Sequence, residues 1–68
     1  MVDINMLRAK VEDKGISYTA LARKAGISRE TLYNRFSNPD NFKVSEVQGI
    51  SEALNLGPSE FRQIFLQD

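Results

Sequence analysis

The segment from Ser28 to Ser37 carries side chains that can recognise another polymer through hydrogen bonds. If this segment is a helix, Leu32 and Phe36 share its buried side, because they stand four residues apart. The polar side chains that project away from that side are Arg29, Glu30, Thr31, Tyr33 and Asn34. Arginine matches the acceptors of guanine, asparagine matches adenine, glutamate accepts from cytosine, and the threonine methyl packs on thymine. The pattern favours base reading in a DNA major groove, although each residue also fits an ordinary solvated helix surface.

A second short segment precedes this one and is expected to position it. Ser17 and Ser28 stand where N-cap hydroxyls are expected, and Gly26 stands where a helix ends in a left-handed conformation. The small residues Ala22 and Ala25 allow a close approach between neighbouring helices. We therefore predict helices over residues 18–25 and 29–37 that form a helix-turn-helix unit, whose second helix is the one that enters a major groove.

Three more helices are predicted around this unit, which makes the expected fold all-α and compact, with five helices. The first covers residues 3–14 with Asp3 as its cap, the fourth runs from Val44 to about Asn55, and the fifth runs from Pro58 to about Leu66. The apolar positions of the fourth helix are Val44, Val47, Ile50 and Leu54. Gly49 among them predicts close packing against a neighbouring helix, and Phe42 is expected to anchor the preceding loop to the core.

Composition narrows the possible functions. Sixty-eight residues predict one domain over residues 1–68. There is no cysteine and no histidine, so we expect no disulfide, no metal site and no cofactor. Catalysis would need paired carboxylates in a pocket, and the neighbouring Glu12 and Asp13 point different ways on a helix, so we expect no enzyme. No apolar run is long enough to span a membrane, which predicts a cytoplasmic protein.

The charges are distributed unevenly along a chain whose formal net charge is zero. Residues 17–43 hold five basic side chains against two acidic ones, and the remainder holds four against seven. A basic region within a neutral domain is expected of a protein that binds DNA phosphates. The candidates for phosphate contacts are Ser17, Tyr18, Arg23, Ser28, Arg35, Asn38, Asn41 and Lys43.

The C-terminal segment carries more apolar side chains than one short helix can bury on one side. The excess predicts either completion of the core or a two-fold contact in a homodimer. The candidate residues for that contact are Phe61, Ile64, Phe65 and Leu66. We favour the homodimer, which would present two recognition helices about one DNA turn apart.

Two sequence motifs resemble those of a known family. Residues 21–36, LARKAGISRETLYNRF, and residues 46–61, EVQGISEALNLGPSEF, are similar to the lambda repressor and Cro class of DNA-binding domains. The ending RQIFL looks like that of small Cro-like repressors from phages of Gram-positive hosts. Lys43 departs from the family, which usually caps its fourth helix with serine or threonine. Residues 31–36 also look like a TetR-type recognition helix, but that class continues into a large ligand-binding domain.

The resemblance implies a sequence-specific transcriptional regulator that occupies an operator in double-stranded DNA, in the cytoplasm and on the nucleoid of a bacterial host. Repression would follow where that operator overlaps a promoter. A different reading is a helix-turn-helix module that binds another phage regulator as an antirepressor or co-regulator. The polar, base-matched side of residues 29–37 favours DNA, because a protein-binding face would be more apolar.

Overall fold

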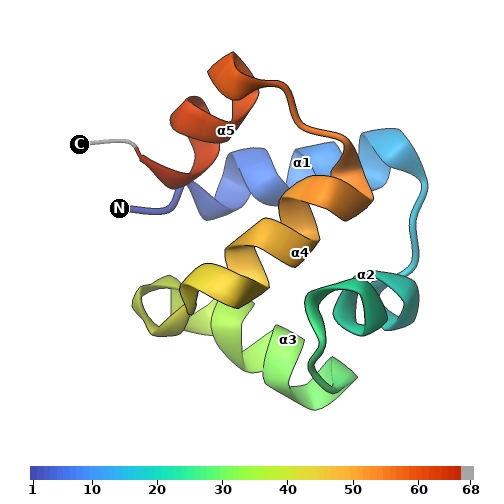
Figure 1. The fold of residues 1–68 in the computed structure, drawn as a ribbon. Helices are drawn as coiled ribbons and strands as arrows, with labels where there is room; N and C mark the ends of the chain where they lie inside the picture. Colours follow the sequence, from blue (N-terminus) through green and yellow to red (C-terminus); the bar gives the residue numbers. More distant parts are fainter. Residues whose placement is uncertain (67–68) are drawn as a thin grey trace.

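The computed structural model describes residues 1–66. Within that range the chain forms five α-helices and one short 3-10 turn. They are α1 (Ile4–Lys14), α2 (Tyr18–Ala25), α3 (Arg29–Ser37), η1 (Pro39–Asn41), α4 (Val44–Leu54) and α5 (Pro58–Phe65). In Figure 1, α4 crosses the middle of the molecule, α1 and α5 lie together on one side, and α2 and α3 lie on the other. The predicted all-α architecture is therefore confirmed.

The turn between α2 and α3 has the capping geometry that the sequence predicts. The Ser17 hydroxyl accepts from the Ala20 amide at 3.1 Å, and the Ser28 hydroxyl accepts from the Thr31 amide at 3.0 Å. Gly26 adopts a left-handed conformation with φ of 75°, which only glycine enters without a steric cost. The Ile27 amide then donates back to the Ala22 carbonyl at 3.0 Å. These bonds fix the direction in which α3 leaves the turn.

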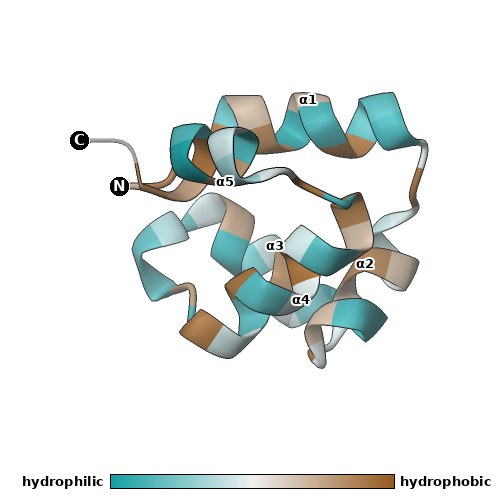
Figure 2. Ribbon diagram, turned by 45° about the horizontal axis from the view of Figure 1, so that its top comes forward, coloured by the Kyte–Doolittle hydropathy of each residue, from teal (hydrophilic) through white to brown (hydrophobic). Residues whose placement is uncertain are grey.

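One apolar core joins the five helices. Six of its side chains are less than 2% exposed: Leu7, Leu21, Leu32, Ile50, Leu54 and Ile64. Hydrophobic and hydrophilic stretches alternate along the helices in Figure 2, as expected of short amphipathic helices around a shared centre. All six aromatic residues form one chain of neighbouring rings, in the order Tyr33, Tyr18, Phe36, Phe42, Phe65 and Phe61. This chain of rings joins α3 to α5.

Helices α2 and α4 approach each other closely at Gly49. A methyl group at this position would lie 2.5 Å from the Lys24 carbonyl oxygen and 2.6 Å from the Ala25 Cα. Both are backbone atoms in the last turn of α2, so they cannot rotate aside. The predicted reason for a glycine inside α4 is thereby confirmed.

The N-termini of α4 and α5 are capped from inside the helix. The Lys43 amide donates to Glu46 at 3.0 Å, and the Gly57 amide donates to Glu60 at 3.1 Å. A glutamate at the third helical position satisfies a free amide in this way. Glu46 therefore supplies one half of a capping box, and it accepts a different amide from the one that a serine or threonine hydroxyl at position 43 would accept.

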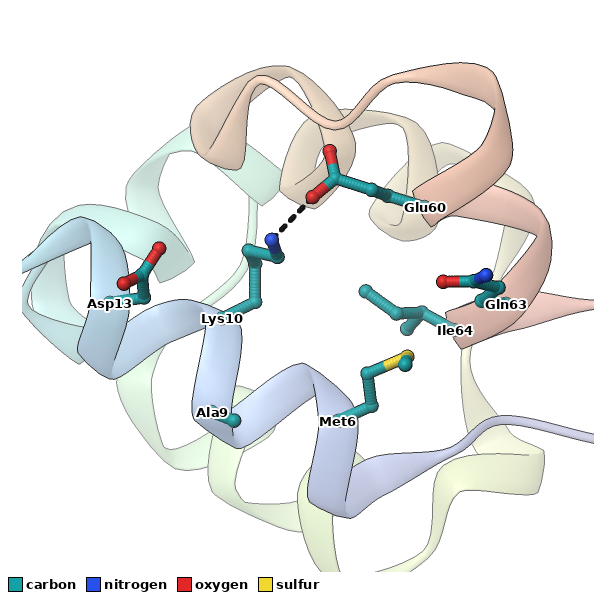
Figure 3. Close-up of a pocket in the computed structure, with 7 residues that line it drawn as sticks. All are labelled: Met6, Ala9, Lys10, Asp13, Glu60, Gln63 and Ile64. Carbon is teal, nitrogen blue, oxygen red and sulfur yellow. Dashed lines mark hydrogen bonds and ion pairs between the residues drawn. The ribbon is translucent and has the colours of Figure 1, made fainter.

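A shallow hollow of about 340 Å³ lies between α1 and α5. Figure 3 shows Lys10 of α1 reaching across it to an ion pair with Glu60 of α5, while Met6 and Ile64 form its apolar side. The two charged groups at its centre satisfy each other, so the pair fastens α1 to α5.

Some boundaries and burial predictions need correction. Helix α4 ends at Leu54, because Asn55 takes a left-handed conformation with φ of 53°, and α5 ends at Phe65. Val44 is 76% exposed and does not belong to the core, because it is the first residue of α4 and the helix enters the core one turn later. Phe42 does anchor its loop, with its ring 6.4 Å from that of Phe36 and 6.2 Å from that of Phe65.

Candidate nucleic-acid interface

The two sides of α3 are divided as the sequence predicts. Leu32 is fully buried and Phe36 is 4% exposed, so both hold the helix against the core. The side chains of Arg29, Glu30 and Asn34 are exposed, and Thr31 is half-buried. The helix therefore presents a polar outer surface whose donors and acceptors match base edges.

Arg29 rests on an aromatic pair at the N-terminal end of this surface. Its guanidinium carbon lies 5.9 Å from the centre of the Tyr33 ring, within the range of a cation–π interaction. Tyr33 packs edge-on against Tyr18, with ring centres 5.3 Å apart, yet it remains 46% exposed. Tyr33 thus combines core-edge packing with an outward surface, and it supports the side chain of Arg29.

Two of the residues predicted for phosphate contacts, Ser17 and Ser28, use their hydroxyls at the helix caps. Ser17 and Ser28 accept amide protons within their own helices, and Ser28 also donates to the Thr31 hydroxyl at 2.9 Å. Their role in the structure is to start α2 and α3 in the right directions. Tyr18 is half-buried, because its ring also packs on Phe36 with centres 5.3 Å apart.

Arg35 makes hydrogen bonds within the protein, and its phosphate contact stays a prediction. Its Nε donates to Glu46 Oε1 at 2.9 Å, and one terminal nitrogen donates to Glu46 Oε2 at 3.2 Å. The other terminal nitrogen donates to the Asn34 side-chain oxygen at 2.9 Å. The side chains of Arg35 and Glu46 are only 15% and 5% exposed. Arg35 therefore joins α3 to α4, and its charge is neutralised within the protein.

Glu46 is a structural residue behind this surface that sequence reasoning missed. Glu46 stands three residues after Lys43, whose side chain cannot cap a helix. This spacing is a sequence signal that the glutamate accepts the backbone amide at the helix start. No signal indicated its partner, because Arg35 stands 11 residues away. The pairing depends on how α3 crosses α4.

Acid should weaken this link. The hydrogen bond from Arg35 lowers the pKa of the Glu46 carboxyl below its ordinary value of 4.5; burial opposes the shift, and the Lys43 amide adds to it. Because the pKa of this carboxyl is lower in the folded state than in the unfolded state, its ionised form stabilises the fold. This stabilisation is fully present above about pH 4.5 and is lost as pH falls through the folded pKa. Lys10 lowers the pKa of Glu60 in the same direction.

We predict that Glu46→Gln lowers the thermal midpoint at neutral pH, and that its difference from the wild type shrinks as pH falls below about 4.5. Thermal unfolding followed by circular dichroism between pH 7 and pH 3 measures this. Glu12→Gln is the control, because Glu12 is exposed on α1. A pH-independent difference for Glu46→Gln would contradict the charged pairing.

The remaining phosphate candidates keep outward-facing groups. Arg23, Asn38, Asn41 and Lys43 are all exposed. Lys43 makes no side-chain capping bond, so its ammonium is available to solvent or to an anion. Asn38 donates weakly to the Asn34 carbonyl oxygen, at 3.4 Å. Arg23 stands in the last turn of α2, where a cation is also favoured by the helix dipole.

The predicted dimer residues divide into two groups. Ile64 is fully buried and Phe65 is 7% exposed, so both pack in the core of the single chain. Leu66 is 60% exposed, and Phe61 is half-buried. The sequence could not separate these residues, because the direction of α5 across the core decides which of its apolar side chains turn inward.

Comparison with known proteins identifies the class. A family model described as Helix-turn-helix matches residues 7–61, from within α1 to the first half of α5. Neither the curated proteins nor the solved structures gave a significant match.

The chain belongs to the helix-turn-helix family of the lambda repressor and Cro type, with the five-helix fold of that class. It is a DNA-binding regulator, and the family is generally non-enzymatic. Across residues 1–66 no helix is long and apolar enough to cross a membrane.

Proposed function

We propose that this chain is a sequence-specific transcriptional regulator that places α3 in the major groove of an operator. The observation that carries the proposal is the exposed polar surface of α3, with Arg29, Glu30 and Asn34 on a helix that the core holds rigidly. Phosphate contacts from Lys43 and Arg23 would set its position on the duplex without reading sequence. Occupation of a promoter by this domain would repress transcription in a bacterial cytoplasm, on the nucleoid, and the sequence resemblance supports a phage or prophage origin.

Methylation interference on a bound duplex tests the groove assignment. Methylation of guanine N7 blocks the major groove, and methylation of adenine N3 blocks the minor groove. We expect binding to be lost on guanine N7 methylation within the site and retained on adenine N3 methylation. Interference at adenine N3 alone would contradict insertion of α3 into the major groove.

Lys43→Ala tests the phosphate contact. We expect it to weaken binding to cognate and random duplexes alike and to reduce the slope of log affinity against log salt by about 1, because one fewer counterion is released. Fluorescence anisotropy between low and near-physiological salt measures the slope. Arg62→Ala, which removes an exposed cation on α5 away from α3, should leave the slope unchanged. An unchanged slope for Lys43→Ala would remove Lys43 from the phosphate contacts.

We further propose that the active form is a homodimer. An apolar hollow of about 400 Å³ lies between η1, the start of α4 and α5. Val44, Phe61 and Leu66 line it, and Val44 and Leu66 are 76% and 60% exposed. Large exposed apolar side chains grouped in this way favour a contact with a second copy. A two-fold axis there would present two α3 helices to one face of the duplex.

Leu66→Glu tests the dimer. We expect the dimer dissociation constant to rise at least about tenfold, because burying each leucine contributes about 1.5–3 kcal/mol. Sedimentation equilibrium measures the change. Met6→Glu is the control, because Met6 is an exposed apolar residue beside the other hollow, between α1 and α5. A monomeric wild type at all accessible concentrations would contradict the dimer.

A further inference from the structure

We propose that Arg35 holds the Asn34 side chain as a hydrogen-bond donor, so that Asn34 selects guanine, then thymine, at its base pair and disfavours adenine. Arg35 would thus be a positioning residue for base selection. The inference rests on the proposed function, because it requires α3 to lie in the major groove. It reverses the simple expectation that an asparagine on a recognition helix reads adenine.

The orientation of the Asn34 amide follows from the chemistry of its neighbours. The terminal nitrogen of Arg35 lies 2.9 Å from one end of that amide. A guanidinium can only donate, so the amide atom that faces it must be the oxygen. The Asn41 side chain donates to the same oxygen over a longer distance of 3.5 Å. The Asn34 NH₂ group has no hydrogen-bond partner among residues 1–66 and is left to donate outward from an exposed residue.

The orienting group is itself fixed. Arg35 donates two bonds to the two carboxylate oxygens of Glu46, the fork geometry that arginine forms best. Glu46 in turn accepts the Lys43 amide at the start of α4, and its side chain is only 5% exposed. The guanidinium cannot turn away from Asn34 without breaking a buried ion pair. Helix α4 therefore determines, through Arg35, which end of the Asn34 amide meets the DNA.

This orientation changes which bases fit. Reading adenine with both amide atoms requires the oxygen to accept from the adenine amino group, but here that oxygen already accepts from Arg35 at 2.9 Å, and the Asn41 side chain is a second, longer donor at 3.5 Å. A donor alone matches guanine best, since guanine N7 and O6 are adjacent acceptors, and matches thymine O4 next. Adenine offers N7 as its one acceptor but places its own amino donor beside that of Asn34, and cytosine offers only a donor. The expected order is guanine, thymine, adenine, cytosine.

Selection of duplexes from a random pool, carried out in parallel with the wild type and three variants, tests the order. Asn34→Ala locates the base pair, because preference should disappear at one position only. There the wild type should prefer guanine over adenine by about tenfold, the effect of one hydrogen bond. Replacing that guanine by 7-deazaguanine should weaken wild-type binding by a similar factor and leave Asn34→Ala unaffected.

The other two variants separate orientation from stability. Asn34→Asp keeps an acceptor for Arg35 but cannot donate, so its preference should move to cytosine. Arg35→Lys can still pair with Glu46, but it lacks the planar fork that reaches Glu46 and Asn34 together. The Asn34 amide is then free to turn its oxygen toward the DNA, so the preference should shift toward adenine. A merely structural role for Arg35 would weaken binding to every sequence without changing the base preferred. If circular dichroism shows that Arg35→Lys does not fold, the base preferences of the wild type and of Asn34→Asp still test the orientation of the Asn34 amide.

Two outcomes would overturn the proposal: one contradicts only the orientation of Asn34, and the other contradicts the proposed function as well. A wild-type preference for adenine at this position, lost when the adenine amino group is removed and unchanged in Arg35→Lys, would overturn the orientation alone. The absence of any enriched sequence from folded wild-type protein would contradict the proposed function, and the orientation with it.

Discussion

Gly49→Ala is expected to destabilise the domain by about 1–3 kcal/mol, the usual cost of overpacking. Alanine is intrinsically the better helix former by about 1 kcal/mol, so the sign of the change depends on packing. The added methyl group would lie 2.5 Å from the Lys24 carbonyl oxygen and 2.6 Å from the Ala25 Cα. Because both atoms belong to the backbone of α2, α4 must move away from the helix-turn-helix unit.

Urea unfolding followed by circular dichroism measures this change. Gly57→Ala is the matched control, because Gly57 has a φ of −76° and the nearest atom to an added methyl group is a flexible Glu60 oxygen at 3.8 Å. We expect it to cost no more than about 1 kcal/mol, because alanine is a poorer N-cap than glycine but meets no backbone atom here. A Gly49→Ala protein as stable as the wild type would show that α2 and α4 can separate without cost.

Arg29→Ala and Asn34→Ala are each expected to cost about 1–3 kcal/mol in binding to the cognate site and to relax the preference at one base pair. Both side chains are exposed on the outer surface of α3, away from the buried Leu32 and Phe36. Arg29 also contacts Tyr33, with its guanidinium carbon 5.9 Å from the ring centre.

Competition binding against cognate and random duplexes separates base reading from general affinity. Arg62→Ala is the control for the loss of one positive charge, since Arg62 is exposed on α5. Its effect should be small and independent of sequence. If Arg29→Ala or Asn34→Ala lost the same affinity on random DNA as on the cognate site, that residue would not be a base reader.

The helix-turn-helix unit is predictable from sequence because its signals are local. Ser17 and Ser28 each cap a helix by bonding to an amide three residues later, and Gly26 takes the left-handed turn between the helices. The buried pair of Leu32 and Phe36 fixes which side of α3 faces outward. These features need no knowledge of distant residues.

The rest of the site depends on contacts between helices, which sequence does not reveal. Arg35 is a plausible phosphate ligand until α4 places Glu46 beside it. Asn34 is a plausible adenine reader until Arg35 occupies its oxygen. Val44 follows the apolar spacing of α4, yet it stands at the helix start and remains exposed. In each case the crossing of two helices decides the environment of the residue.

Selection of bound duplexes from a random DNA pool at near-physiological salt tests the central claim most directly. A sequence-specific homodimer predicts an enriched motif with two-fold symmetry and half-sites about one helical turn apart. A single enriched half-site would retain DNA recognition and contradict the dimer. Folded protein that enriches no sequence would contradict the assignment as a sequence-specific regulator and would favour a role in binding another regulator.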